Sequence, residues 1–132
     1  CNENSNCQLG AAIEHESSPF LGQDAGDIAG VGSLNKKLVS QLDDVAADFN
    51  TLIDFTRPDV TLKNLASCVA NGKNIVIGTT GFNDQEKQQI QKASESISVV
   101  FAPNMSVGVN LCFKLLDIAA RVLGDDVDIE IV

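Results

Sequence analysis

Two hydrophobic patterns alternate along the chain. In one, a few mostly apolar residues follow one another; in the other, apolar side chains recur every three or four positions. The first pattern is typical of buried strands and the second of amphipathic helices. The predicted strands cover residues 8–14, 37–39, 51–55, 74–77, 97–101 and 127–132. Because strands and helices alternate, we expect βαβ units and a parallel sheet with helices on both faces.

Start and stop signals frame the predicted helices. Pro58 suits the first turn of a helix, and Gly72 stands where a left-handed residue ends one. Asn83 and Glu86 have the spacing of a capping box. We expect these helices to bury their apolar positions, which are Leu62, Leu65, Ala66 and Val69 in the first and Ile90 and Ala93 in the second.

The longest predicted helix begins after Ser106, which can cap it, and ends at Gly124. Its inward face is expected to carry Val107, Leu111, Leu115, Ile118, Ala119 and Val122. Earlier in the chain, the Gly- and Ser-rich stretch 15–35 predicts a long surface loop, and residues 43–48 predict a short helix.

The length of 132 residues predicts one domain or part of one. The chain does not begin with Met, and its last predicted strand has no turn signal after it. Both features suggest a piece of a longer sequence. The expected fold is therefore an α/β, Rossmann-like parallel sheet that is truncated at both ends.

Composition narrows the possible functions. Hydrophobic residues make up 44%, with no Trp or Tyr, so the core must be largely aliphatic. The formal net charge of −9 disfavours nucleic acid and anionic membrane surfaces as partners. No apolar run approaches the ~20 residues of a membrane span, and no secretory signal opens the chain.

The cysteines do not suggest a metal site. Cys1, Cys7, Cys68 and Cys112 lack regular spacing, and His15 is the single histidine. A zinc site is therefore poorly supported. Free thiols and a cytoplasmic location are the interpretation we favour.

Candidate chemistry follows the predicted strands. Ligands of open parallel sheets bind at the carboxyl ends of the strands, and these ends share one edge of the sheet. The segments that follow four strands are 14–15, 54–57, 78–81 and 102–106. They are short and mostly polar, so a nucleotide-sized ligand could span them.

Each candidate has an ordinary structural alternative. Glu14 can accept both hydroxyls of an adenosine ribose, or it is a solvated residue at a strand end. Arg57 can contact a phosphate, or it pairs with Asp54 or Asp59 at the surface. Asn104 can hold an amide or a carboxylate, or it is a turn residue.

Two glycine-containing segments are candidates for contact with a nucleotide cofactor. Gly78, Thr79 and Thr80 can approach a nicotinamide ribose or amide with their backbone N–H groups and two hydroxyls, or they form a plain strand-to-helix turn. A Gly-x-Gly-x-x-Gly fingerprint is absent, because residues 30–35 lack the third Gly and do not open a helix.

Taken together, these segments are more specific than any one of them. They are Glu14, DFTRP at 54–58, VIGTTGF at 76–82 and FAPNMSVGVN at 101–110, with LGQDAG at 21–26 and DIEI at 128–131. In this order the chain resembles the dihydrodipicolinate reductase family, also called 4-hydroxy-tetrahydrodipicolinate reductase. The resemblance runs along nearly the whole sequence.

The resemblance implies a partial dinucleotide-binding domain over residues 1–132 that binds NADH or NADPH, without the substrate domain that follows it in the family. The implied cofactor-binding residues are Glu14, His15, Phe55, Thr56, Gly78, Thr79, Thr80, Ala102, Pro103, Asn104 and Met105. Met105 replaces the family's frequent Phe, and His15 stands where the family often has Arg. Because Glu14 repels a 2′-phosphate and His15 carries charge only when protonated, we expect NADH to serve at least as well as NADPH.

The implied activity is an NAD(P)H-dependent reduction in lysine and diaminopimelate biosynthesis. The resemblance places a strand with a Gly-rich phosphate loop before these residues. It places a His-His pair, a catalytic Lys and a Ser-Gly-Thr loop after them. No catalytic residue is therefore expected within the 132 residues, and the isolated chain should show no turnover. A small-molecule substrate and a homo-oligomeric parent enzyme are also implied.

Two alternatives stay open at this point. One is a nucleotide-binding module without chemistry. The other is a different Rossmann reductase, similar to homoserine dehydrogenase.

Overall fold

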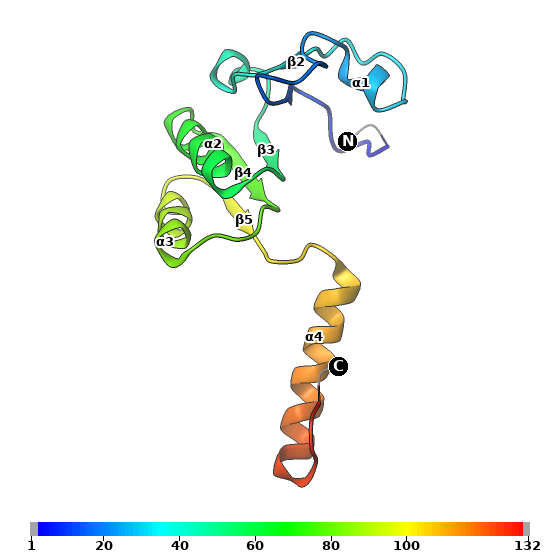
Figure 1. The fold of residues 1–132 in the computed structure, drawn as a ribbon, viewed down its shortest axis with the longest axis vertical. Coiled ribbons are helices and arrows are strands. Elements are labelled where there is room, and N and C mark those ends of the chain that lie inside the picture. Colours follow the sequence, from blue (N-terminus) through cyan, green and yellow to red (C-terminus); the bar gives the residue numbers. More distant parts are fainter. Residues whose placement is uncertain (1–2, 131–132) are drawn as a thin grey trace. The chain divides into compact units, whose positions relative to one another are not determined.

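The computed structural model describes residues 3–130. The chain divides into two compact units, the first ending at Phe101 and the second beginning at Ala102. Figure 1 shows the elements of both units. The first unit contains β1 (Ala12–Ile13), α1 (Ala25–Ile28), β2 (Leu38–Val39), η1 (Asp43–Val45), β3 (Thr51–Asp54), α2 (Pro58–Ala70), β4 (Asn74–Ile77), α3 (Asp84–Ala93) and β5 (Val99–Phe101). The second contains α4 (Val107–Leu123) and η2 (Gly124–Asp126).

A three-stranded parallel sheet is the centre of the first unit. Its strand order is β3-β4-β5, so β4 is the middle strand. In register, Asp54 lies opposite Ile77, and Ile77 lies opposite Phe101. Parallel strands joined by α2 and α3 confirm the predicted α/β, Rossmann-like fold.

A second, smaller parallel sheet consists of β1 and β2, with Ala12 opposite Leu38. The two sheets are separate, because β1 pairs with β2 alone and β3 pairs with β4 alone within residues 3–130. The strand predicted over residues 8–14 is therefore reduced to two residues. Just before it, the backbone packs closely: a Cβ at Gly10 would lie 2.3 Å from the carbonyl oxygen of Asp48.

The main hydrophobic core lies between one face of the three-stranded sheet and the helices α2 and α3. Its buried members are Leu42, Leu65, Cys68, Ile75, Ile77, Phe82, Ile90, Ala93 and Ile97. On the opposite face of the sheet, Ile53 is 57% exposed and Val100 is 53% exposed. The prediction for α3 is confirmed, since Ile90 and Ala93 are both buried.

The predicted buried face of α2 is partly wrong. The buried residues of this helix are Thr61, Leu65 and Cys68, whereas Ala66 and Val69 are exposed. The reason is a hydrogen bond: the Thr61 hydroxyl donates to the carboxylate of Asp54 over 3.0 Å. This contact turns a polar residue toward the sheet, and the helix face rotates with it.

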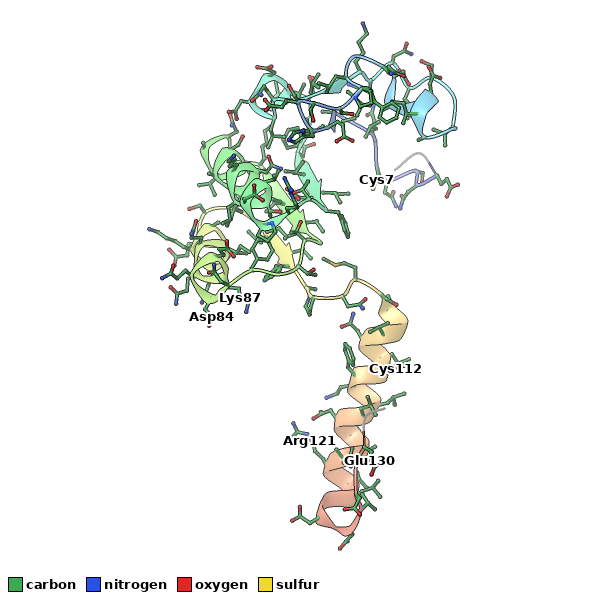
Figure 2. The ribbon with its side chains drawn as sticks, viewed as in Figure 1. Cys7, Asp84, Lys87, Cys112, Arg121 and Glu130 are labelled. Atoms are coloured by element: carbon green, nitrogen blue, oxygen red, sulfur yellow. The ribbon has the colours of Figure 1, made fainter. Side chains whose placement is uncertain are left out.

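The predicted helix ends are confirmed. Asn83 and Glu86 form a reciprocal capping box at the start of α3. On the solvent side of the same helix, Lys87 Nζ lies 3.2 Å from Asp84 Oδ1 (Figure 2). After α2, Gly72 has a φ of 62°, a left-handed conformation in which a side chain would be strained.

The stretch predicted as a long loop, 15–35, contains the short helix α1. Asp24 organises it. The carboxylate accepts backbone N–H groups from Gly26, Asp27, Leu34 and Lys36. These bonds, led by the one from Leu34, lower the pKa of Asp24 from 3.8 to about 2.

In the second unit, Ser106 caps α4 as predicted, because its hydroxyl accepts the N–H of Val109. The helix ends at Gly124, whose φ is 57°. The expected inward face is exposed instead, with Val107 at 84%, because the described residues of this unit bury no residue of α4. Residues 127–130 form no strand, which corrects the prediction for 127–132; residues 131–132 and Cys1 lie outside the described residues.

Within residues 3–130, every helix is too short or too polar to cross a lipid bilayer.

We expect Asp24→Ala to loosen the segment 24–36, since four backbone N–H groups lose their acceptor. Amide hydrogen exchange of Gly26, Leu34 and Lys36 should accelerate at neutral pH. The pKa of Asp24 is lower in the folded chain, so its contribution to stability is present above pH 3.8 and is lost as the pH falls toward about 2. Wild type and variant should therefore converge in that range.

Asp27→Ala is the matched control for this experiment. Asp27 is an exposed acidic residue of the same short helix. The Asp27→Ala variant should leave the amide hydrogen exchange of Leu34 and Lys36 unchanged. Equal acceleration in both variants would contradict the capping role of Asp24.

Candidate functional site

The candidate site lies at the carboxyl ends of β3 and β4. Because Asp54 is opposite Ile77, the segments that follow the two strands leave the sheet side by side. The N–H of Gly78 donates to the carbonyl oxygen of Asp54 over 2.8 Å. The structure thus brings Phe55 and Thr56 together with the Gly78–Thr80 turn, as the sequence predicts.

The aromatic ring of Phe55 occupies the space that a side chain at position 78 would need. A Cβ at Gly78 would lie 2.1 Å from Cε1 and 2.3 Å from Cζ of this ring. No side chain fits there unless the ring moves. Phe55 is itself 65% exposed, so its ring forms part of the surface of the site.

Asp54 is a buried carboxylate between these two segments, and only 2% of it is exposed. Its Oδ1 accepts the N–H of Thr56 (3.0 Å) and the hydroxyls of Thr56 (2.7 Å), Thr61 (3.0 Å) and Thr79 (3.2 Å). Its Oδ2 accepts Nδ2 of Asn64 over 2.8 Å. Among residues 3–130, no basic side chain forms an ion pair with it.

This cluster decides which groups of the Gly78–Thr80 turn remain available. The Thr79 hydroxyl is buried, because it bonds Asp54 and accepts from Thr61 over 2.9 Å. Thr80 is exposed. The prediction that both hydroxyls face a ligand is therefore corrected: Thr79 is only 4% exposed, and Thr80 alone offers its side chain.

Sequence reasoning placed Asp54 in the candidate segment 54–57 but gave its side chain no role except as a partner of Arg57. The available signal was a carboxylate at the end of an apolar strand, followed by hydroxyl residues at Thr56 and Thr61. Arg57 pairs instead with Asp59, with Nε 4.0 Å from Oδ1, and both side chains are exposed. The surface-pair alternative is thus confirmed for Asp59.

Glu14 and His15 follow β1 and are both exposed. The Glu14 N–H donates to the carbonyl oxygen of Val39, and Oε1 of its side chain accepts the His15 N–H over 2.7 Å. On the imidazole of His15, Nδ1 accepts the N–H of Ser17 over 3.2 Å. Glu14 Oε2 and His15 Nε2 have no hydrogen-bond partner among residues 3–130.

A cleft of about 1720 Å³ connects the two groups of residues within the first unit. Glu14 and His15 line it on the side of the small sheet, and Phe55, Thr56 and Arg57 line it on the side of β3. The unpaired edges of β1 and β3 both line this cleft.

The remaining predicted site residues, Ala102, Pro103, Asn104 and Met105, open the second unit. Asn104 Oδ1 accepts the N–H of Ser106 over 2.8 Å, and its carbonyl oxygen accepts Nδ2 of Asn110 over 2.9 Å. Asn104 therefore shapes the turn before α4, as its structural alternative predicts. Its own amide N–H₂ is left to donate elsewhere.

The described cysteines are free thiols in three different settings. Cys7 and Cys112 are exposed (Figure 2), and Cys68 is buried in α2. Burial, followed by the negative charges of Asp54 and Asp43, raises the pKa of the Cys68 thiol to about 11. Over the described part of the chain, no group of three or more acidic, His or Cys side chains could hold a metal ion.

Residues 1–105 match the family model described as dihydrodipicolinate reductase, N-terminus. The match covers most of the chain, including both sheets and the turns that follow β3 and β4. It ends at Met105, directly before the cap of α4.

We expect Gly78→Ala to lower the free energy of unfolding by about 0.5–1.5 kcal/mol, because the new methyl group overlaps the exposed Phe55 ring and forces it out of its present rotamer. Chemical denaturation measures this change. Gly108→Ala is the control, since the nearest atom to its added Cβ, Ser106 Oγ, is 3.8 Å away. That variant should be neutral or more stable by up to about 1 kcal/mol. A neutral Gly78→Ala would contradict the close contact.

Proposed function

The chain belongs to the dihydrodipicolinate reductase family, and from this premise we propose that it is the nucleotide-binding part of an NAD(P)H-dependent reductase. The proposed reaction is the reduction of 4-hydroxy-tetrahydrodipicolinate to tetrahydrodipicolinate, a step of lysine and diaminopimelate biosynthesis in the cytoplasm. The observation that carries the proposal is that Glu14 and the Phe55–Thr56 segment follow the carboxyl ends of two parallel strands, β1 and β3, and line the same cleft.

At one end of the cleft, the residues fit an adenosine ribose. Glu14 is exposed, and one of its carboxylate oxygens has no partner among the described residues. A carboxylate in this place accepts from the two ribose hydroxyls. The neighbouring His15 exposes an imidazole with a free Nε2, which can face a phosphate when the ring is protonated.

At the carboxyl edge of β4, the residues fit the nicotinamide end. Gly78 leaves room for the Phe55 ring beside the turn, and Thr80 adds an exposed hydroxyl. The family resemblance assigns the segment 102–105, which opens the second unit, to the same end of the cofactor. An amide such as that of Asn104 can bond the carboxamide of a nicotinamide.

When bound, the reduced nicotinamide supplies a hydride to the substrate. The residues of this chain orient that ring with the Gly78–Thr80 turn, and the ring of Phe55 keeps water from one side of the turn. The family resemblance assigns the proton donor to a His-His pair and a Lys beyond residue 132. This chain is then the half of the enzyme that holds the cofactor.

The open strand edges support a partial dinucleotide-binding domain. Unpaired backbone groups of β1 and β3 line the same cleft, and both strands belong to parallel sheets. A parallel strand between them would pair with both edges and join the sheets. The resemblance assigns such a strand, with its Gly-rich phosphate loop, to the residues that precede this segment in the family.

Titration calorimetry with NADH and NADPH tests the binding half of this proposal, and a spectrophotometric assay with the lysine-pathway substrate tests the reaction. The full-length protein that carries this chain should bind both cofactors and turn over, and the 132 residues alone should not turn over. Binding without turnover by the full-length protein would favour the non-catalytic module. Absence of binding would contradict the proposal.

We expect His15→Arg to strengthen NADPH binding by roughly 1.5–3 kcal/mol, because a fixed guanidinium can bond the 2′-phosphate at any pH. NADH affinity should change little. The dissociation constants of both cofactors, measured for the full-length protein at two pH values, decide the outcome.

Glu14→Gln and Glu16→Gln form a matched pair beside this experiment. Both remove one exposed negative charge from the same segment. Only Glu14→Gln should weaken NADH, since it alone loses a ribose acceptor. A strong preference of the wild type for NADPH that does not change with pH would show that another residue binds the phosphate.

A further inference from the structure

We propose that Asp54 is a positioning residue for the nucleotide site and acts through the hydroxyl of Thr79. Its carboxylate holds the Gly78–Thr80 turn in the orientation that exposes Thr80 and the turn's backbone. The inference rests on the proposed function, because it assigns a purpose to the geometry of that same site.

The first argument is the unusual setting of this carboxylate. A buried charge without a basic partner is costly unless several donors surround it. Asp54 receives five such donor contacts, from Thr56, Thr61, Asn64 and Thr79. An apolar residue at this strand end would pack against the same core with none of these requirements.

The second argument is where the donors come from. Thr56 belongs to the segment after β3, Thr61 and Asn64 to the first turns of α2, and Thr79 to the segment after β4. One side chain therefore ties three elements together at the edge of the sheet. Its backbone carbonyl adds a fourth tie, to the N–H of Gly78 over 2.8 Å.

The third argument concerns the directions in which the side chains of Thr79 and Thr80 point. Successive residues of an extended segment point to opposite sides. Because Asp54 and Thr61 hold the Thr79 hydroxyl inside, the side chain of Thr80 points outward. The Thr56 contacts fix the start of the neighbouring segment in the same way and keep the Phe55 ring against Gly78.

The test compares Thr79→Val with Thr79→Ser in the full-length protein that carries this chain. Valine keeps the shape of threonine and lacks the hydroxyl, whereas serine keeps the hydroxyl. We expect Thr79→Val to raise the dissociation constant of NADH about tenfold or more, the size of one lost bond to a charged group. Thr79→Ser should restore it to within about threefold, and hydrogen exchange of Thr80 and Gly81 should follow the same order.

Asp54→Asn should behave as Thr79→Val does, and Asp84→Asn is its matched control. Asp84 is a carboxylate at the start of α3 that bonds Lys87, but it is exposed and does not line the cleft. It should leave NADH binding unchanged. If Thr79→Val does not fold, Thr61→Val replaces it, because it removes the hydroxyl that lies within hydrogen-bond distance of both Asp54 and Thr79.

Two results overturn the inference. One is a Thr79→Val protein with a lowered melting temperature and wild-type NADH affinity, which would make the cluster purely structural. The other is equal exchange of Thr80 and Gly81 in the Val and Ser variants. If the wild type binds no nicotinamide cofactor, the proposed function fails on its own, and the exchange comparison still decides the positioning role.

Discussion

The arrangement of residues at the carboxyl ends of β3 and β4 depends on one requirement. The buried carboxylate of Asp54 needs hydrogen-bond donors. A charge that is removed from water must recover its lost hydration from the protein. Here the donors are hydroxyls, one backbone N–H and one side-chain amide, and no basic residue in the described part of the chain pairs with the carboxylate. Meeting that requirement fixes the side of α2 that faces the sheet and the direction of the turn after β4.

The strands impose a second constraint through their backbone groups. Each strand must pair its N–H and C=O groups with a neighbour or leave them to water. In the three-stranded sheet, β4 is paired on both sides and contributes the two most deeply buried aliphatic residues, Ile75 and Ile77. The outer strand β3 and the short β1 each keep one edge open, and their open edges line the cleft. The cleft therefore exists because β1 and β3 each lack a second partner strand among residues 3–130.

The sequence predicted those elements whose signals are local. Apolar residues in NIVI mark β4 with its observed bounds, and Asn83 with Glu86 marks the start of α3. The buried face of α2 could not be predicted in the same way, because hydropathy treats Thr61 as a surface residue. Its burial depends on a carboxylate seven residues away in another element. The short helix α1 was missed for a related reason, since Asp24 reaches as far as Leu34 and Lys36.

The candidate site shows the same division between local and long-range information. That Phe55, Thr56 and Gly78 meet at one edge follows from parallel pairing alone. The exposure of their side chains does not follow from it. Glu14 and Asp54 illustrate the difference, because both are carboxylates at or next to the carboxyl end of a parallel strand. Glu14 is exposed and has one oxygen without a protein partner, whereas donors of the protein occupy both oxygens of Asp54. An acceptor with an unoccupied oxygen can bind a ligand's hydroxyl groups, and an acceptor already saturated by the protein can only hold the protein in place. In a chain with a formal net charge of −9, this distinction separates the carboxylate suited to recognition from the one suited to support.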